Sequence, residues 1–155
     1  MTDVERQERS AALKRLDAFV GKWTVELVFP AHPDHPGFTG QTQGSFEWLD
    51  KDKTFLVYRA GTEGSGFPVG YCIIGGDDNT ENYTVLYSDS RGVARIYQMS
   101  FKDGKWKQWR DDPSDFSQRF SATFSKDGRT ITGQWDIDED DAWHKDFDIT
   151  YTKND

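Results

Sequence analysis

The segment Leu16-Asp-Ala-Phe-Val-Gly-Lys-Trp-Thr-Val-Glu-Leu-Val-Phe29 decides the fold of this chain. Its first residues continue a short amphipathic helix, and Gly21 interrupts that helix. From Trp23 onward, large apolar side chains alternate with polar ones. Period-two alternation after a glycine break is typical of a β-strand with one buried face. We therefore expect a helix over about residues 4–18, followed by a first strand that begins near residue 22.

The composition fits a single β-rich domain. Of the 155 residues, 35% are hydrophobic and 15% are aromatic, including six Trp, six Tyr and eleven Phe. A chain of this length fits one domain, and wide aromatic side chains suit the tapered interior of a β-barrel. We expect one domain over residues 1–155, with an N-terminal helix within 1–18 and a barrel over 22–152.

The charge balance argues against two classes of partner. The chain has 19 Lys and Arg residues and 27 Asp and Glu residues, which gives a formal net charge of −8. An acidic chain without a basic stripe is poorly suited to nucleic acid or to anionic membrane surfaces. Cys72 is the single cysteine, and no apolar leader or run of transmembrane length is present. We therefore expect a cytoplasmic protein that binds neither nucleic acid nor membranes.

Short apolar runs separated by turn residues follow the first strand. A loop rich in proline and glycine is expected over 30–43. Nine further strands are expected at about 44–49, 54–61, 68–75, 83–87, 93–101, 105–110, 117–125, 130–138 and 142–152. Ten antiparallel strands with no helix between them favour an all-β, up-and-down barrel, because closure removes the exposed edges. A two-sheet sandwich is the alternative.

Several blocks of the sequence resemble lipocalin-like (calycin) barrels, and in particular nitrobindin-like and related bacterial single-domain proteins. They include the Gly21-x-Trp23 motif, the strand Phe55-Leu-Val-Tyr-Arg59 and the segment from Tyr87 to Tyr97. The resemblance covers about residues 13–152 and implies a barrel in which the indole of Trp23 closes one end. Lipocalins also carry an arginine of the last strand over this tryptophan, and the expected last strand of this chain has no arginine.

The resemblance also implies haem, which nitrobindin-like proteins hold through a histidine near the start of the last strand. Asp146 and Asp148 stand about where that ligand is expected, and His144 is close by. In a regular strand, His144 shares its face with both aspartates. The opposite, apolar face carries Trp143, Phe147, Ile149 and Tyr151. We therefore expect His144 to face outward and haem not to bind specifically, unless a bulge reverses the alternation.

Two neighbouring strands are expected to form a polar wall inside the barrel. Arg95 and Tyr97 share a face with three apolar residues, so we expect both to point inward. An inward arginine is costly unless a carboxylate or a bound anion pairs with it. With Arg110, these side chains could hold a ligand carboxylate or phenolate. The alternative is a structural network at the rim, in which the arginines pair with Glu47, Asp89 or Asp111.

The sequence favours binding of a small apolar or aromatic molecule inside the barrel, although a filled core would explain the same aromatic residues. The candidate ligand-binding residues are Trp23, Phe46, Trp48, Tyr71, Arg95, Tyr97, Trp106, Arg110 and Trp135. Three alternatives are a nitrobindin-type haem protein, a small barrel enzyme of the isomerase or hydrolase type, and a homodimeric interaction scaffold. No catalytic residue is assigned.

No metal site is expected from the sequence. His32 and His35 lie in a proline-rich loop that presets no further ligand. The acidic run 136–141 lacks the spacing of a calcium loop. No nucleophile motif is present either, and Cys72 has no basic neighbour in the sequence.

Overall fold

The computed structural model describes residues 9–62, 66–77, 81–111, 117–139 and 141–155. Two short helical segments come first, the α-helix α1 (Ala11–Arg15) and the 3-10 helix η1 (Leu16–Phe19). The strands are β1 (Gly21–Phe29), β2 (Phe38–Trp48), β3 (Leu56–Ala60), β4 (Gly70–Gly76), β5 (Tyr83–Asp89), β6 (Ala94–Lys102), β7 (Lys105–Arg110), β8 (Gln118–Phe124), β9 (Thr130–Glu139) and β10 (Ala142–Lys153).

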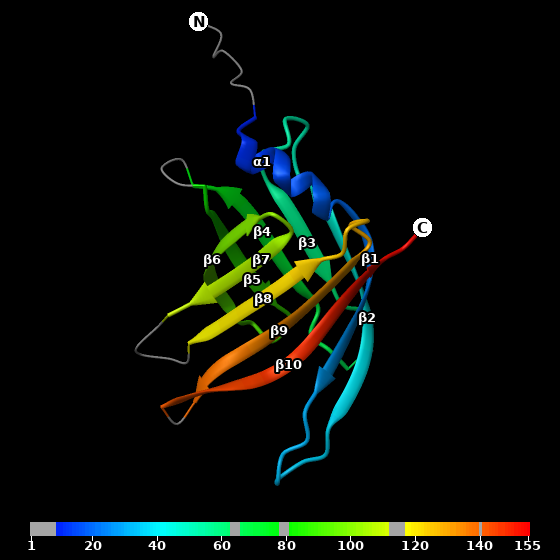
Figure 1. Ribbon diagram of the computed structural model, residues 1–155, viewed down its shortest axis with the longest axis vertical. Coiled ribbons are helices and arrows are strands. Elements are labelled where there is room, and N and C mark those ends of the chain that lie inside the picture. Colours follow the sequence, from blue (N-terminus) through cyan, green and yellow to red (C-terminus); the bar gives the residue numbers. More distant parts are fainter. Residues whose placement is uncertain (1–8, 63–65, 78–80, 112–116, 140) are drawn as a thin grey trace, which may run out of the picture.

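In the described residues, the strands form one closed ten-stranded antiparallel barrel, as the sequence predicts (Figure 1). Each strand pairs with its neighbour in the sequence, and β1 also pairs with β10. This last pairing places Trp23 opposite Lys153 and Val28 opposite Asp148. Because it joins the two ends of the sheet, it removes the open edges and excludes the two-sheet sandwich.

The N-terminal helix starts later than predicted. It begins at Ala11, and the Ser10 hydroxyl caps it by accepting a hydrogen bond from the backbone N–H of Leu13 at 3.2 Å. Such a cap satisfies one of the N–H groups that the first turn leaves free. Residues 1–8, which contain the predicted start of the helix, lie outside the described residues. Neither helical segment in the described ranges is long and apolar enough to cross a membrane.

The β1–β2 hairpin is longer than predicted, because the proline-rich loop ends earlier. The loop was expected over 30–43, whereas β2 begins at Phe38 and pairs with β1 up to Phe29. The prolines of this region all precede residue 38. Gly40 suits the added part of the strand, because a Cβ there would lie 2.4 Å from the ring of Phe67. The hairpin extends beyond the other strands at the end of the barrel opposite α1 (Figure 1).

The segment η1 closes one end of the barrel. Phe19 is fully buried there. Its ring centroid lies 4.8–5.1 Å from those of Phe46, Phe101, Trp106 and Phe124. Two hydrogen bonds hold α1 across the same end, from the Tyr83 hydroxyl to the Ala12 carbonyl at 2.6 Å and from Arg15 Nε to the Phe101 carbonyl at 3.0 Å. Phe19 therefore acts as an aromatic plug among rings from four strands.

Trp23 lies beneath this plug, so the prediction that its indole closes the barrel end is confirmed. The indole is fully buried, and its N–H donates to the Phe19 carbonyl at 2.8 Å. Lys153 of β10 lies over the ring, with its Nζ 5.4 Å from the ring centroid. A Cβ at Gly21 would lie 2.8 Å from Lys153 Cε. The glycine of the Gly21-x-Trp23 motif therefore leaves the space that the lysine needs to reach the indole.

A β-bulge divides β10 and changes which of its residues face inward. Lys145 pairs with Asp136 and Phe147 pairs with Trp135, so Asp146 is an extra residue on its strand. A bulge of this kind reverses the alternation on its two sides. Asp146, which was expected to face outward, instead lines the barrel cavity.

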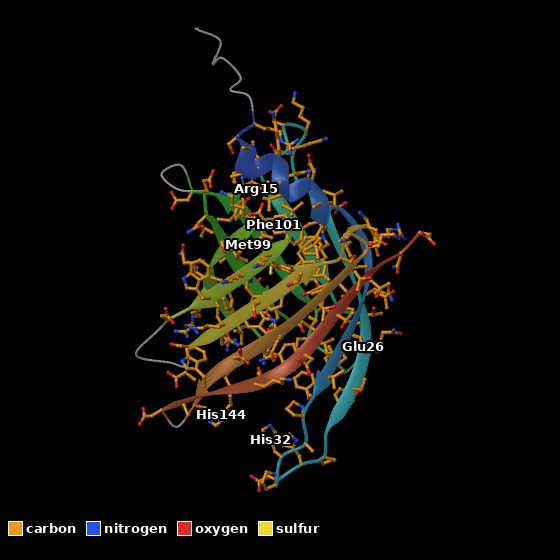
Figure 2. The ribbon with its side chains drawn as sticks, in the orientation of Figure 1. Arg15, Glu26, His32, Met99, Phe101 and His144 are labelled. Carbon is orange, nitrogen blue, oxygen red and sulfur yellow. The ribbon has the colours of Figure 1, made fainter. Side chains whose placement is uncertain are left out.

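The bulge also corrects the expected faces of the two residues at the start of β10. Trp143 was expected to face inward, but it is exposed on the outer face, where the Arg119 guanidinium lies 4.0 Å from its ring centroid. His144 pairs with Ile137, a cavity residue, so its strand position is on the inner side rather than the outer one. Its side chain is nevertheless exposed, at the open rim of the barrel (Figure 2).

Candidate ligand-binding cavity

The barrel encloses a cavity of about 650 Å³ that opens at the end opposite α1. Each of the ten strands contributes at least one lining side chain. The closed end is filled by buried side chains, among them Leu16, Phe19 and Trp23. The cavity volume lies within the range of about 300–1,000 Å³ that is usual for small-molecule sites. The barrel is therefore not filled. This excludes the filled core that would also have explained the aromatic residues of the sequence.

Aromatic rings surround this cavity in an almost continuous belt. Successive ring centroids in the belt are 4.3–6.4 Å apart. In order, its members are Phe46, Tyr58, Tyr151, Trp106, Phe120, Trp135, Tyr97 and Tyr87. Most of these pairs are tilted or edge-to-face, which are favourable arrangements for aromatic pairs. The belt makes most of the cavity wall aromatic, and β4 adds Cys72 and Ile74 between its two ends.

Two amide side chains supply polar groups on the β6–β8 side of the wall. The Tyr97 hydroxyl donates to Gln118 Oε1 at 2.6 Å, and the Trp106 indole N–H donates to Gln108 Oε1 at 3.1 Å. Both glutamines are buried. Burial raises the pKa of the Tyr97 hydroxyl, which keeps it protonated at neutral pH. These groups are therefore uncharged and hold one another in place.

A second polar cluster lies on the opposite side of the wall. The phenols of Tyr58 and Tyr151 both line the cavity, with their ring centroids 6.4 Å apart, and burial raises the pKa of both hydroxyls well above the ordinary value. Burial also raises the pKa of the Cys72 thiol to about 12, so this thiol is a poor nucleophile. The Thr42 hydroxyl is buried, and no hydrogen-bond partner for it exists within the described parts of the chain. This cluster too is uncharged.

The mouth of the cavity carries the basic side chains Arg91 and Arg95 on its β5–β6 side. Arg91 donates to the buried Asp89 carboxylate at 2.7 Å, and the Tyr87 hydroxyl donates to the same carboxylate at 2.5 Å. The Arg91 guanidinium holds the pKa of Asp89 far below its ordinary value. The positive charge of Arg95 lowers the pKa of the Tyr97 hydroxyl and so partly offsets the larger effect of burial, which raises it. This side of the mouth is thus fixed by an ion pair.

The opposite side of the mouth is acidic. Asp138 and Glu139 end β9, and Asp146 is the bulged residue of β10. Burial raises the pKa of Asp146, and the nearby Glu139 raises it further, whereas His32 in the β1–β2 loop lowers it. The mouth is therefore divided into a basic half and an acidic half.

Five of the nine candidate residues from the sequence line this cavity. They are Phe46, Arg95, Tyr97, Trp106 and Trp135. The inward direction expected for Tyr97 and Trp106 is observed, and Gln108, which pairs with Met99, lies between these two levels on the same inner face. Trp23 is buried below the floor of the cavity and does not line it.

Tyr71 does not face the cavity, which corrects the expectation for β4. Its side chain is 47% exposed on the outer surface, and Ile73 points the same way with 40% exposure. The inward residues are instead Gly70, Cys72 and Ile74. Both faces of this strand are apolar, so the alternation of apolar side chains did not distinguish them.

Trp48 and Arg110 also lie away from the cavity. The Trp48 indole N–H donates to Asp17 Oδ1 at 3.0 Å, and the Arg9 guanidinium lies 5.0 Å from its ring centroid. Trp48 therefore holds the N-terminal segment against the closed end. Arg110 lines a shallow groove on the outer surface, which Arg95 also borders. Only Arg95 of the expected pair of arginines reaches the cavity.

Several cavity residues were missed by the sequence interpretation. The most important are Thr42, Tyr58, Cys72, Gln118 and Asp146. Tyr58 could have been found, because it is two residues from both Leu56 and Ala60 and therefore shares their inward face. Asp146 could not, because no sequence signal marks the bulge that turns it inward.

The residues of the cavity do not fit the haem that the resemblance implies. All three histidines of the chain, His32, His35 and His144, are exposed, and none lines the cavity. The thiol and the phenols that do line it have raised pKa values, so they are protonated and poor iron ligands. In the described residues, no group of three or more metal-ligating side chains is present.

Comparison with known proteins supports the fold. No family model and no curated protein matches the chain. The structure is similar to the crystal structure of Rv2717c from M. tuberculosis, with a TM-score of 0.65 over 94% of this chain and 99% of that chain. The two sequences are 12% identical, so the similarity shows a shared barrel fold and does not place the chain in the lipocalin or nitrobindin families.

Proposed function

We propose that this protein binds a small apolar or aromatic molecule inside its barrel. The observation that carries the proposal is the cavity of about 650 Å³ with an aromatic belt and a few uncharged polar groups. Apolar walls with a small number of fixed polar groups are typical of ligand sites. The plugged end and the open mouth give the ligand one route of access.

The first test is native mass spectrometry of the protein purified from its own host. A retained small molecule, released on denaturation, would support the proposal and identify the ligand class. A neutral, environment-sensitive dye provides a second measurement, because its emission rises in an apolar cavity.

A pair of variants separates binding in the cavity from binding at the surface. Ala60 lines the cavity near the mouth, and Ala60→Phe should fill part of it and lower dye affinity. Ser121 is exposed on the outer face of β8, and Ser121→Phe adds the same ring outside the barrel. Equal dye affinity in wild type and both variants, with no molecule retained from the host, would refute the proposal.

A specific observation also favours the alternative of a homodimer. The outward-facing positions of β4, β5 and the adjacent part of β6 carry no charged side chain, although 30% of the chain is charged. Ile73, Leu86 and Ile96 are neighbours in register on this face and are 40–60% exposed. Two copies with a net charge of −8 repel each other, so a face without carboxylates is where they can meet. We infer that a second copy of this chain covers it, as an isologous dimer.

The oligomeric state tests this second candidate. Wild-type protein should elute as a dimer in size-exclusion chromatography with light scattering, and Leu86→Lys should be a monomer. Thr123→Lys, which adds the same charge on the exposed outer face of β8, should remain a dimer. A wild-type monomer at high protein concentration would contradict the inference.

A further inference from the structure

The charged side chains that line the cavity all lie at its mouth. Arg91 is in the β5–β6 turn and Arg95 is the second residue of β6. Asp138 and Glu139 end β9, and Asp146 is near the start of β10. These strand ends meet at the rim marked by His144 and His32 in Figure 2, and the plugged end lies on the other side, near Arg15 and Phe101. Among the described lining residues, the deeper part of the cavity therefore has no charged group.

The deeper polar groups are neutral donors and acceptors. They are the neighbouring phenols of Tyr58 and Tyr151, the hydrogen-bonded pairs Tyr97–Gln118 and Trp106–Gln108, and the Thr42 hydroxyl. A carboxylate that entered this region would lose its hydration without gaining a counter-charge, which is strongly unfavourable. A hydroxyl or carbonyl oxygen would lose much less and could regain a hydrogen bond here.

Some hydrogen-bond donors of this region are taken by protein acceptors, and others are available to a ligand. The O–H of Tyr97 and the N–H of Trp106 are directed to glutamine oxygens. Tyr58 and Tyr151 line the cavity as neighbours and together have two O–H donors, of which a hydrogen bond between their hydroxyls can use only one. The second O–H is left to donate to another acceptor. The Thr42 hydroxyl, which has no hydrogen-bond partner among the described residues, belongs to the same side of the barrel, since Thr42 and Tyr151 both pair with Val25.

We propose that the ligand enters with an uncharged, oxygen-bearing aromatic end first, and that the carbonyl or hydroxyl oxygen of this end accepts a hydrogen bond from the Tyr58–Tyr151 pair. A charged group, where the ligand has one, stays at the mouth between the basic and acidic halves. The inference rests on the proposed function, because it names the chemical class of the molecule that the cavity holds.

Three probes of nearly equal size test this inference. They are 2-acetylnaphthalene, which has a neutral carbonyl, 2-naphthoate, which is anionic, and 2-ethylnaphthalene, which has no oxygen. Binding is followed by quenching of tryptophan fluorescence, because Trp106 and Trp135 line the cavity. The ketone is expected to bind tightest, by roughly fivefold over the hydrocarbon for one net hydrogen bond, and by a larger factor over the acid.

Variants locate the hydrogen bond. A single Tyr→Phe change leaves one phenol of the pair free to donate, so the decisive variant is Tyr58→Phe with Tyr151→Phe. It should bind the hydrocarbon as the wild type does and lose the preference for the ketone. Tyr83→Phe, which removes a phenol at the plugged end, should keep the preference. Retained hydrocarbon binding shows that the double variant keeps its cavity.

The outcomes separate this inference from the proposed function. Binding of 2-naphthoate more tightly than the ketone would overturn the inference and leave the proposed function standing. A ketone preference that persists in a folded double variant would overturn the assignment to the phenol pair. Failure of all three probes to bind would overturn both. The wild-type order of affinities tests the inference even where the double variant does not fold.

Discussion

Replacement of Trp23 by alanine should cost about 3–5 kcal/mol of folding free energy. The indole is fully buried beneath Phe19, so its removal loses apolar burial and leaves a void at the plugged end. It also removes the donor to the Phe19 carbonyl, which is 2.8 Å away, and leaves that buried acceptor unpaired. For a chain of this size, the loss corresponds to a fall in Tm of about 6–20 °C.

Thermal unfolding followed by circular dichroism measures this effect, and two variants act as controls. Trp23→Phe keeps most of the buried ring and should lose only about 1–2 kcal/mol, mainly the hydrogen bond. Trp143→Ala removes an exposed tryptophan and its contact with Arg119, which is worth about 1 kcal/mol or less. If Trp23→Ala unfolds no earlier than Trp143→Ala, the assignment of Trp23 to the floor of the closed end is refuted.

Three further predictions concern the charged groups and haem. The low pKa of Asp89 means that its carboxylate stabilises the fold above about pH 4, so Asp89→Asn should lower Tm at pH 7, and the difference should shrink as the pH falls toward the folded-state pKa. The raised pKa of Asp146 means that its carboxylate has the opposite effect and destabilises the fold. This destabilisation is absent below the ordinary pKa of an aspartate and develops as the pH rises through the pKa of Asp146 in the folded state. Asp146→Asn should therefore raise Tm at pH 7 and have little effect near pH 3. A Tm of Asp89→Asn that equals the wild-type value at pH 7, or a Tm of Asp146→Asn that falls below it, would contradict the described mouth. Haem titration should give a broad, weak absorption band that His144→Ala leaves unchanged, because His144 is exposed outside the cavity; a sharp Soret band that depends on His144 would show otherwise.

The fold could be predicted because its strongest signals are local. The glycine before Trp23, the alternation that follows it and the regular spacing of turns each indicate antiparallel strands, and together they favour a closed barrel. The face of β6 was predicted correctly, because Tyr97, Met99 and Phe101 are much larger and more apolar than most residues between them. A strong contrast between the two faces fixes which one is buried.

The parts that could not be predicted depend on features that leave little trace in the sequence. The outward position of Tyr71 could not be predicted, because β4 is apolar on both sides and the pattern of apolar residues does not show which side is buried. The bulge at Asp146 reverses one half of a strand, and nothing in the sequence marks it. Trp48 contacts a helix that lies across the barrel end, and such a tertiary contact depends on where the helix packs.

The closure of the barrel through β1 and β10 has a consequence for how the chain folds. Trp23 is paired with Lys153, so the first strand finds one of its two partners only in β10, the last strand of the barrel. Pairing over so long a stretch of chain is slow to form. Until it forms, β1 and β10 each present an open edge, and open edges invite pairing with other chains. Loss of the last strand should therefore lead to aggregation during synthesis, because the remaining nine strands cannot protect their edges.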